Sequence, residues 1–525
     1  MNLPLVPLIH APRTPIAAAM VLVMLAGNAG AAVINVPADQ PTVQAAIDAA
    51  VNGDVIVIAP GRYVEKIHLK GKAITVRGAM NAEDTILDGG GTPGFVVQIR
   101  NGEGPKTIIE NLTITGAKGI NNANIGSGVY ILNTSPTLRR LIIMDNHAGP
   151  AYGGGVYIKG GAASLHQVSF TGNSALTGGN VYIESSHATI KESLFMHGNA
   201  QNGGGYAVLG GKATLHDSWF ESNMANSLGG AIYVAHASLD MKNLTVRDNG
   251  KVESCGYYCV TYSPLAGGAI YASGTSGTIR DSVLENNSGA FGGAVYVAGF
   301  GSSPHFVNCV IAHNRGGTGA VYCNDSSPKF INSTIFKNTY GGVFTSSSAR
   351  PTMTNSIIAG HDLPDSAGVD IYGSGKTTVS YSLIQGLAFN ETINGPGVFR
   401  ANPKLDANYV PLPTSPVIDA GNSAAVPSGV TTDVYGRPRF VDDPFTPDTG
   451  LGFPVVDLGA VEFQPGGASV ICSADIDRSG FVDTDDYDAY IMLYVMGADA
   501  ADFDNSGFVD TDDLDAFVRA FESGC

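Results

Sequence analysis

The stretch that decides the fold is Gly292-Gly293-Ala294-Val295-Tyr296-Val297, because close copies of it recur along the middle of the chain. In each copy, paired glycines, which take positive φ at little cost, precede a short β-branched and aromatic run. The other clear copies begin at Gly153, Gly178, Gly229 and Gly267. The aromatic residue advances by 25 from Tyr157 to Tyr182, and by 25 again from Tyr271 to Tyr296. A fixed period of this size predicts a solenoid.

A second apolar run follows in each period and predicts a second strand. The runs are Leu165–Phe170, Ile190–Phe195, Leu215–Phe220, Ile279–Leu284, Phe306–Ile311 and Phe330–Ile335. An asparagine follows the runs at nearly constant phase: Asn146, Asn173, Asn199, Asn223, Asn249, Asn287, Asn314 and Asn338. Asparagine tolerates left-handed backbone and hydrogen-bonds its own main chain. Stacked copies therefore predict an internal ladder of amides.

Two or three strands per period, without helical periodicity, are typical of a right-handed parallel β-helix. We therefore expect an all-β solenoid. Roughly twelve coils at about 4.8 Å each would make a rod on the order of 55 Å long. From Val33 to Gln464 the chain resembles the pectin-lyase-like superfamily of secreted β-helix proteins. That resemblance implies a fold and leaves the activity open.

The N-terminus is typical of a secretory signal. Arg13 supplies a positive charge, Ile16–Leu25 is a short apolar run, and Ala29-Gly30-Ala31 offers a small-x-small cleavage site. We expect residues 1–31 to be a signal peptide, and the mature chain to be secreted, extracellular or on the cell surface. No later apolar run is long enough for a transmembrane span.

The net charge of −17 is unevenly distributed. Residues 472–525 hold 14 acidic residues against Arg478 and Arg519, which leaves −12 there and −5 in the remainder. The predicted rod is thus nearly neutral for its size. We expect no nucleic-acid partner, because such a partner requires a cationic face.

Residues 32–390 are expected to form the β-helix with its N-terminal cap. In that cap, Pro41–Ala50 has apolar residues at helical spacing and predicts a short helix. Residues 391–464 are rich in Pro, Asp and Gly, and resemble the terminal region of bacterial secreted β-helix proteins; we interpret them as a C-terminal cap. Its aspartates could bind calcium, although hydrogen bonds from their side chains to the nearby backbone are the favoured interpretation.

An insertion interrupts the period between Tyr233 and Tyr271, where the step is 38. The additional residues lie near Asn249–Leu265 and include Cys255, Cys259 and three tyrosines. Two interpretations stay open: an aromatic loop that binds sugar rings, or a disulfide-pinned excursion without a ligand.

Six cysteines fit an oxidising compartment. We expect Cys472 and Cys525 to close the C-terminal segment that they bracket. Cys255 with Cys259 would form a tight local loop. Cys309 and Cys323 are either bonded or simply buried.

The clearest chemical pattern lies in residues 472–525, the C-terminal module. Two segments place oxygen ligands at positions 1, 3, 5, 7, 9 and 12 of a calcium loop, with glycine at position 6. The expected ligands are Asp475, Asp477, Ser479, Phe481, Asp483 and Asp486 in the first loop, and Asp502, Asp504, Ser506, Phe508, Asp510 and Asp513 in the second. Closely spaced carboxylates repel one another until a divalent cation neutralises them, and hard oxygens favour Ca²⁺.

Each loop is followed by one apolar helical pattern, and no helical pattern precedes Asp475. This arrangement resembles a dockerin module more than an EF-hand pair. The resemblance implies a cohesin-like or cell-surface protein partner. Loop positions 10 and 11, which contact cohesin in that family, are Thr484-Asp485 and Thr511-Asp512 here. The aspartates depart from the small hydroxylated pair of many dockerins, which leaves the class of partner open.

Two hypotheses remain for the rod. In the first, the rod binds or processes extracellular polysaccharide as a lyase or glycoside hydrolase; a lyase needs a base and a cation beside it. The candidate catalytic residues are His166, Lys191, His216 and Asp217. In the second, the rod is a non-catalytic surface or adhesion scaffold. A groove in which Lys or Arg faces acids would favour the enzyme, whereas uniform Ser, Thr and Asn would favour the scaffold.

Overall fold

The computed structural model describes residues 31–119, 128–250, 252–255, 259–262, 264–361, 370–386, 395–465, 474–476, 482, 484–504, 506 and 508–523. The expected signal peptide therefore lies outside the described residues, apart from its last position. Among the described residues, no helix has both the length and the apolar character of a membrane span.

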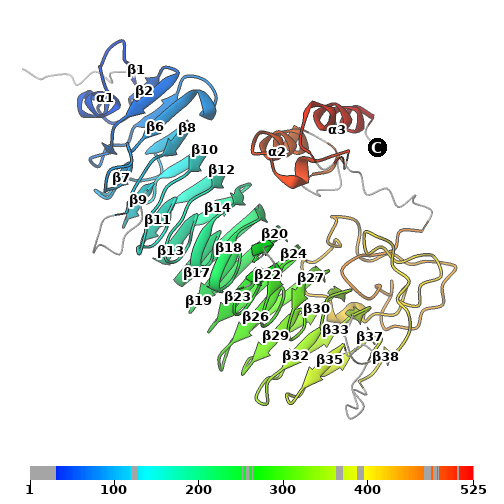
Figure 1. Cartoon of the computed structure of the whole chain (residues 1–525). Helices are drawn as coiled ribbons and strands as arrows, with labels where there is room; N and C mark the ends of the chain where they lie inside the picture. The colour runs from blue at the N-terminus through cyan, green and yellow to red at the C-terminus, as the bar shows by residue number, and fades with distance from the viewer. Residues whose placement is uncertain are drawn as a thin grey trace, which may run out of the picture.

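The chain from β1 (Val33–Val36) to β38 (Val398–Phe399) climbs one axis as a parallel β-solenoid, as predicted (Figure 1). The strands that follow the Gly-Gly pairs stack into one sheet, which we call the tyrosine sheet. The remaining strand segments of the coils stack into a second sheet, which bends and which we call the bent sheet. Parallel pairing links equivalent residues of successive coils, such as Tyr157 with Tyr182 and Leu165 with Ile190.

The strands of the tyrosine sheet are β4 (Ile67–His68), β7 (Val97–Ile99), β9 (Val129–Leu132), β11 (Val156–Lys159), β13 (Val181–Ser186), β19 (Ile232–Ala235), β23 (Ile270–Ser273), β26 (Val295–Ala298), β29 (Val321–Asn324), β32 (Val343–Thr345) and β35 (Ile371–Gly373). The long strand β17 (Tyr206–Glu221) passes from this sheet into the bent sheet.

The bent sheet comprises β1, β2 (Val55–Ile58), β3 (Gly61–Val64), β5 (Thr75–Gly78), β6 (Thr85–Asp88), β8 (Ile108–Thr115), β10 (Thr137–Met144), β12 (Ser164–Thr171), β14 (Thr189–Lys191), β15 (Leu194–Met196), β20 (Ser238–Arg247), β24 (Ser276–Glu285), β27 (Ser303–Ala312), β30 (Lys329–Ile331), β31 (Thr334–Phe336), β33 (Thr352–Thr354), β34 (Ile357–Ala359), β36 (Thr378–Ser380), β37 (Ser382–Ile384) and β38. Short pairs join β16 (Asn199–Asn202) to β18 (Met224–Leu228), β25 (Ser288–Gly289) to β28 (Arg315–Gly316), and β21 (Val252–Cys255) to β22 (Cys259–Tyr262).

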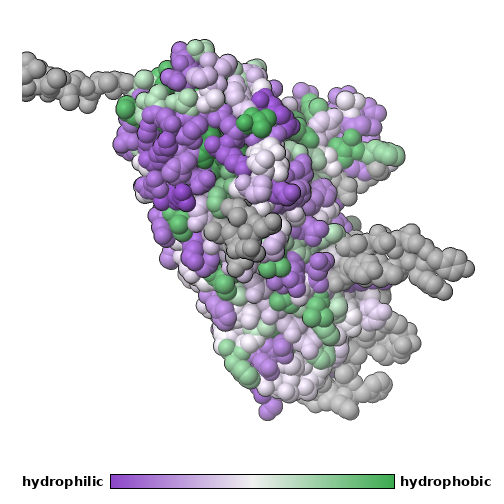
Figure 2. Space-filling model, turned by 60° about the vertical axis from the view of Figure 1, so that its left-hand side comes forward, coloured by the Kyte–Doolittle hydropathy of each residue, from purple (hydrophilic) through white to green (hydrophobic). Residues whose placement is uncertain are grey.

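The core fills the inside of the coils with alternate residues of both sheets, and most of these side chains are fully buried. The predicted N-terminal helix is α1 (Val43–Ala49), capped by the Thr42 side chain, and it packs Val43, Ala46 and Ile47 into the same core. On the face shown in Figure 2, hydrophilic residues gather over the N-terminal part of the rod, and hydrophobic residues are scattered.

The repeating aromatic residues form a column along the tyrosine sheet, as the period predicts. Ring centroids are 5.6 Å apart for Tyr157 and Tyr182, and 5.4 Å for Tyr271 and Tyr296. The column is interrupted at Ala207, which pairs with Tyr182 on one side and Tyr233 on the other. Where the rings stack on one another, the stacked faces are covered by the neighbouring ring.

The asparagine ladder is present inside the coils. Asn223, Asn249, Asn287, Asn314 and Asn338 are buried, and each of the first four donates from Nδ2 to the Oδ1 of the next at 3.0 Å. The same Oδ1 atoms accept the backbone N–H of the preceding asparagine. Each rung thus satisfies buried polar groups of two coils.

The prediction for Asn199 is wrong. Asn199 is exposed, and the ladder position in its coil belongs to Gly198. A Cβ at Gly198 would lie 2.2 Å from the backbone oxygen of Gly204, so no larger residue fits there. Asn180 supplies the missing amide from another part of the coil, because it accepts from Asn173 and donates to Asn223.

The segment from Ala401 to Phe463 packs along the side of the last coils (Figure 1). Its apolar residues cover outward positions of the bent sheet, including Val310 and Ile357. Amides of the rod reach it directly: Asn308 donates to the Thr432 oxygen at 2.8 Å, and Asn355 to the Asn422 oxygen at 2.9 Å. This segment, here the side region, contains the 3₁₀ helix η2 (Ser423–Ala425).

Of the two alternatives for Cys309 and Cys323, the structure shows free, buried thiols. The side chains of Cys255, Cys259, Cys472 and Cys525 lie outside the described residues, so the pairings expected for them stay predictions.

Replacing Asn249 by alanine should lower the free energy of unfolding of the rod by at least about 3 kcal/mol, because it strips hydrogen bonds from several buried groups at once. Urea unfolding followed by circular dichroism measures this. Asn199→Ala is the matched control and should leave stability nearly unchanged. Equal losses in both variants would contradict the role of the ladder.

The ladder ends at His361, whose Nδ1 accepts the backbone N–H of Asn338 at 3.1 Å. Burial lowers the pKa of His361 to about 4. Between pH 6.5 and 4 the imidazole therefore binds a proton in the unfolded chain but not in the folded chain. The free energy of unfolding consequently decreases as the pH falls through this range.

Replacing His361 by asparagine should abolish that loss. The free energy of unfolding of the variant, minus that of the wild type, should increase by about 2 kcal/mol when the pH is lowered from 7.5 to 5. Denaturant unfolding at both pH values measures the shift. Asp370 lies 3.7 Å from His361, and burial raises its pKa to about 7, so its carboxyl group titrates in the same pH range in both chains. A pH-independent gap would show that His361 does not titrate as described.

Candidate functional site

The second predicted calcium loop closes around Asp513. The Asp513 carboxylate accepts the backbone N–H groups of Asp504 at 3.0 Å and Asp510 at 2.8 Å, and these bonds lower its pKa. Ser506 N–H donates to Asp502 and Asp504. One carboxylate oxygen from each of Asp502, Asp504 and Asp513 lies within 4.8 Å of the other two. Three converging hard oxygens fit a Ca²⁺ ion, which would draw its remaining ligands from the same loop.

The remaining predicted ligands of this loop are differently placed. Phe508 is exposed and its backbone oxygen accepts from the Ser506 hydroxyl, while Asp510 accepts the N–H of Asp512 at 2.9 Å. In the first loop, Asp486 is fully buried at the start of helix α2 (Thr484–Val495), and Asp475 is half-buried. Asp477, Ser479, Phe481 and Asp483 lie outside the described residues.

The module has a small aromatic core of its own. Tyr490 of α2 stacks on Phe517 of α3 (Thr511–Ser523), with ring centroids 3.9 Å apart. Between these helices lies the 3₁₀ helix η3 (Asp499–Ala501), whose last carbonyl accepts from the Tyr490 hydroxyl. The same cluster includes Leu194 and Met196 of the rod, so the module rests on the outside of the bent sheet (Figure 1).

Three of the four candidate catalytic residues share one register position. Arg139, His166, Lys191, His216, Lys242 and Arg280 are paired in sequence across six successive coils. We call this series the charged column. Lys191 is exposed, and His216 is partly exposed. The sequence predicts His166, Lys191 and His216 as members of this column; Arg139, Lys242 and Arg280 follow only from the register.

Acidic residues flank the charged column. His166 Nε2 lies 2.7 Å from the Glu192 carboxylate, and His216 Nε2 lies 3.2 Å from Asp240. Lys212 holds the other oxygen of Asp240 at 2.6 Å. Burial alone would raise the pKa of Asp240, but the hydrogen bonds from Lys212 and His216 outweigh it and lower that pKa. Asp240 is therefore a fixed anion that can orient the imidazole of His216.

Asp217 lies apart from His216 although it is the next residue. Gln167, Glu192 and Asp217 take left-handed backbone conformations at the bend of the sheet, with φ near 50°. Asp217 accepts from Asn243 one coil further on, at 3.1 Å. The bend therefore turns Asp217 away from the column and towards helix α2.

A pocket of about 310 Å³ lies between this bend and α2. Its walls include Glu192, Asp217 and Trp219 from the rod, and Asp488 and Met492 from the helix. The Trp219 indole donates to Glu221 at 2.8 Å, and the Arg247 guanidinium lies 5.6 Å from its ring centroid. Trp219 was not among the site residues predicted from the sequence. Its one signal was that it is the only tryptophan in the chain.

The sequence matches the family model described as right handed beta helix region over residues 72–250 and 230–395. Since these matches span more than half of the chain, the protein belongs to that family. Comparison with curated proteins gives no match.

Among solved structures, the chain is similar to a PL6 alginate lyase in complex with a trisaccharide, at 10% identity and a TM-score of 0.40, over 67% of this chain and 85% of that one. It is also similar to the A-module of the Azotobacter vinelandii mannuronan C-5 epimerase AlgE6, at 16% identity and 0.36, over 69% and 94%. A third is pectate lyase Pel9A, at 13% and 0.30, over 83% and 98%. At such identities the likeness concerns the fold alone.

Replacing Asp513 by asparagine should weaken Ca²⁺ binding by the second loop by more than about tenfold. Losing a residue that only supports a metal ligand already costs about 10- to 100-fold in affinity, and Asp513 is predicted to be a ligand itself. Calorimetric titration of the full chain with calcium chloride measures this. Asp515→Asn makes the same change of charge on the exposed face of α3 and should bind normally. Identical isotherms for the two variants would refute a calcium site at Asp513.

Proposed function

We propose that this chain is a secreted protein that binds an acidic polysaccharide along the charged column and processes it by a lyase-type proton abstraction. The calcium-loaded C-terminal module attaches the rod to a protein partner. One observation carries the proposal for the rod: six successive coils each present a cationic or imidazole side chain at one register position.

A polymer of sugar acids is the ligand that such a column fits best. Its carboxylates repeat along an extended chain, and the column repeats cationic groups about every 4.8 Å along the rod. Several weak charge-assisted contacts made together bind a long chain more tightly than any one of them. The overall charge of the rod stays near neutral because carboxylates flank the column.

The His216 region has the parts that a proton abstraction requires. Asp240 binds Nε2 of His216, which leaves Nδ1 to accept a proton from the carbon next to a sugar carboxylate. Lys191 and Lys242 precede and follow His216 in the column. Their charges would stabilise the negative charge that develops on the sugar carboxylate as the proton leaves. Lysines facing acids are what the enzyme hypothesis requires, whereas a scaffold needs no such arrangement.

The proposed role of the C-terminal module rests on its calcium loop and on an exposed surface beside it. Thr511 and Asp512 at the start of α3 are exposed, as are Thr484 at the start of α2 and the Phe508 ring. These positions include those that contact cohesin in dockerins. We propose a cohesin-like or cell-surface protein as the partner, bound only when calcium orders the loops.

Replacing His216 by alanine should lower the turnover of a uronic-acid polymer by about 100-fold or more, the range for losing a general base. Lys191→Ala should lower both kcat and kcat/KM, because the charge of Lys191 is proposed to stabilise the negative charge that develops in the transition state. Absorbance of the unsaturated product measures both effects, and pull-down on immobilised polymer measures binding. His187→Ala, at an exposed position outside the column, is the control and should behave as the wild type.

Full activity of both variants would exclude the charged column as the active site. Binding of the polymer without any turnover by the wild type would remove the lyase step and retain the binding role. Failure to bind any acidic polysaccharide would overturn the proposed function of the rod.

A further inference from the structure

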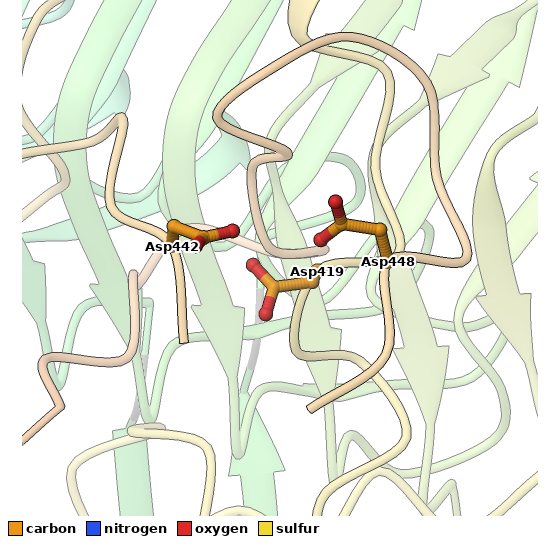
Figure 3. A group of neighbouring side chains, drawn as sticks. All are labelled: Asp419, Asp442 and Asp448. Carbon is orange, nitrogen blue, oxygen red and sulfur yellow. The ribbon is translucent and has the colours of Figure 1, made fainter. Parts of the chain in front are cut away.

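Three carboxylates converge in the side region, far from both calcium loops in the sequence (Figure 3). Asp419 comes from one segment, and Asp442 and Asp448 come from the loop that folds back over it. One oxygen from each lies within 4.8 Å of the other two. Asp419 is buried, Asp442 is half-buried and Asp448 is exposed, so the group leads from the interior to solvent.

The carboxylate of Asp419 has one oxygen without a partner. The side chain is completely buried, and Oδ2 accepts the backbone N–H of Asp443 at 3.2 Å, while Oδ1 has no hydrogen-bond partner in the part of the chain that the structure describes. Figure 3 shows this carboxylate pointing between those of Asp442 and Asp448. A buried carboxylate oxygen without a hydrogen bond is costly unless a cation neutralises it.

The surrounding protein supplies too little positive charge. Behind Asp419 lie the buried Asp457, which accepts the N–H of Asp419 at 2.8 Å, and the buried Glu462. The two nearby arginines pair with other acids. The Nε of the buried Arg439 lies 3.5 Å from the Glu462 carboxylate, and Arg437 pairs with Asp433. Among the residues that the structure describes, no cationic side chain therefore pairs with Asp419, Asp442 or Asp448.

We propose that Asp419, Asp442 and Asp448 bind a calcium ion. Three carboxylates form an oxygen-only donor set, and no Cys or His contributes to the group, so zinc and copper are disfavoured. Ligands from a segment without regular secondary structure suit the adaptable coordination of Ca²⁺ better than the strict octahedron of Mg²⁺. This site is separate from the charged column and from both loops of the C-terminal module.

Binding there would close the side region onto the rod. The Asp419 carbonyl accepts from the N–H groups of Thr449 and Gly450 at 2.9 and 3.0 Å, which holds the loop next to the carboxylates. Three residues away, Asn422 exchanges hydrogen bonds with Asn355 of the rod. An ion that joins Asp419 to Asp442 and Asp448 would therefore stabilise the packing of the side region on the last coils.

The test uses the full chain with both loops of the module disabled by Asp486→Asn and Asp513→Asn. Equilibrium dialysis against calcium chloride should find one ion still bound per chain. Adding Asp448→Asn should abolish it, whereas adding Glu83→Gln, an exposed acid on the 3₁₀ helix η1 (Ala82–Asp84), should not. No bound ion in the parent variant, or no effect of Asp448→Asn, would overturn the proposal. Neither result depends on polysaccharide binding or on a partner.

A second variant guards against misfolding. Asp419→Asn removes the buried charge and keeps the acceptor for Asp443. In EDTA its thermal midpoint should exceed that of the parent, because an uncompensated buried charge is gone. In calcium the order should reverse, because only the parent gains from the ion. The same order in both conditions would show that Asp419 has a structural role without a metal.

Discussion

Stacking of one coil on the next is the constraint on which the rest of the structure depends. A single coil has an apolar inside and unpaired backbone edges, and neither is stable in water. The ladder through Asn223, Asn249 and Asn287 makes the stacking specific. Each amide has its hydrogen bonds only when its neighbour is in register, so a slipped coil would leave buried polar groups unpaired. In the coil that has Gly198 at the ladder position, the amide of Asn180 donates to Asn223 instead.

Register converts a period in the sequence into columns of side chains with different roles. On the tyrosine sheet the column is aromatic, and neighbouring rings stack on one another. On the bent sheet the column from Arg139 to Arg280 is charged and open to solvent. Residues one position apart can therefore serve different surfaces, as His216 and Asp217 do, because Asp217 itself takes the left-handed conformation that turns the chain at the bend.

Both C-terminal parts of the chain pack on the outside of the same sheet. The second half-strand presents apolar side chains outward, such as Leu194 in one coil and Val310 in another, where a solvated face would be polar. The C-terminal module covers the former and the side region the latter. This explains why the pocket beside Trp219 has a helix for one wall, and why the Asp419 group forms on the side of the rod.

The sequence by itself determined the solenoid, the aromatic column and most of the amide ladder, because repetition at one period requires repetition in space. It also located the two acidic loops that are predicted to bind calcium, since their proposed ligands lie close together in the chain. Only the tertiary structure decided that Asn180 replaces Asn199, that Asp240 is the partner of His216, and that Trp219 lies under α2. It alone brought Asp419 to Asp442 and Asp448. Such contacts depend on how coils are offset and where distant segments fold back, and neither is encoded in local spacing.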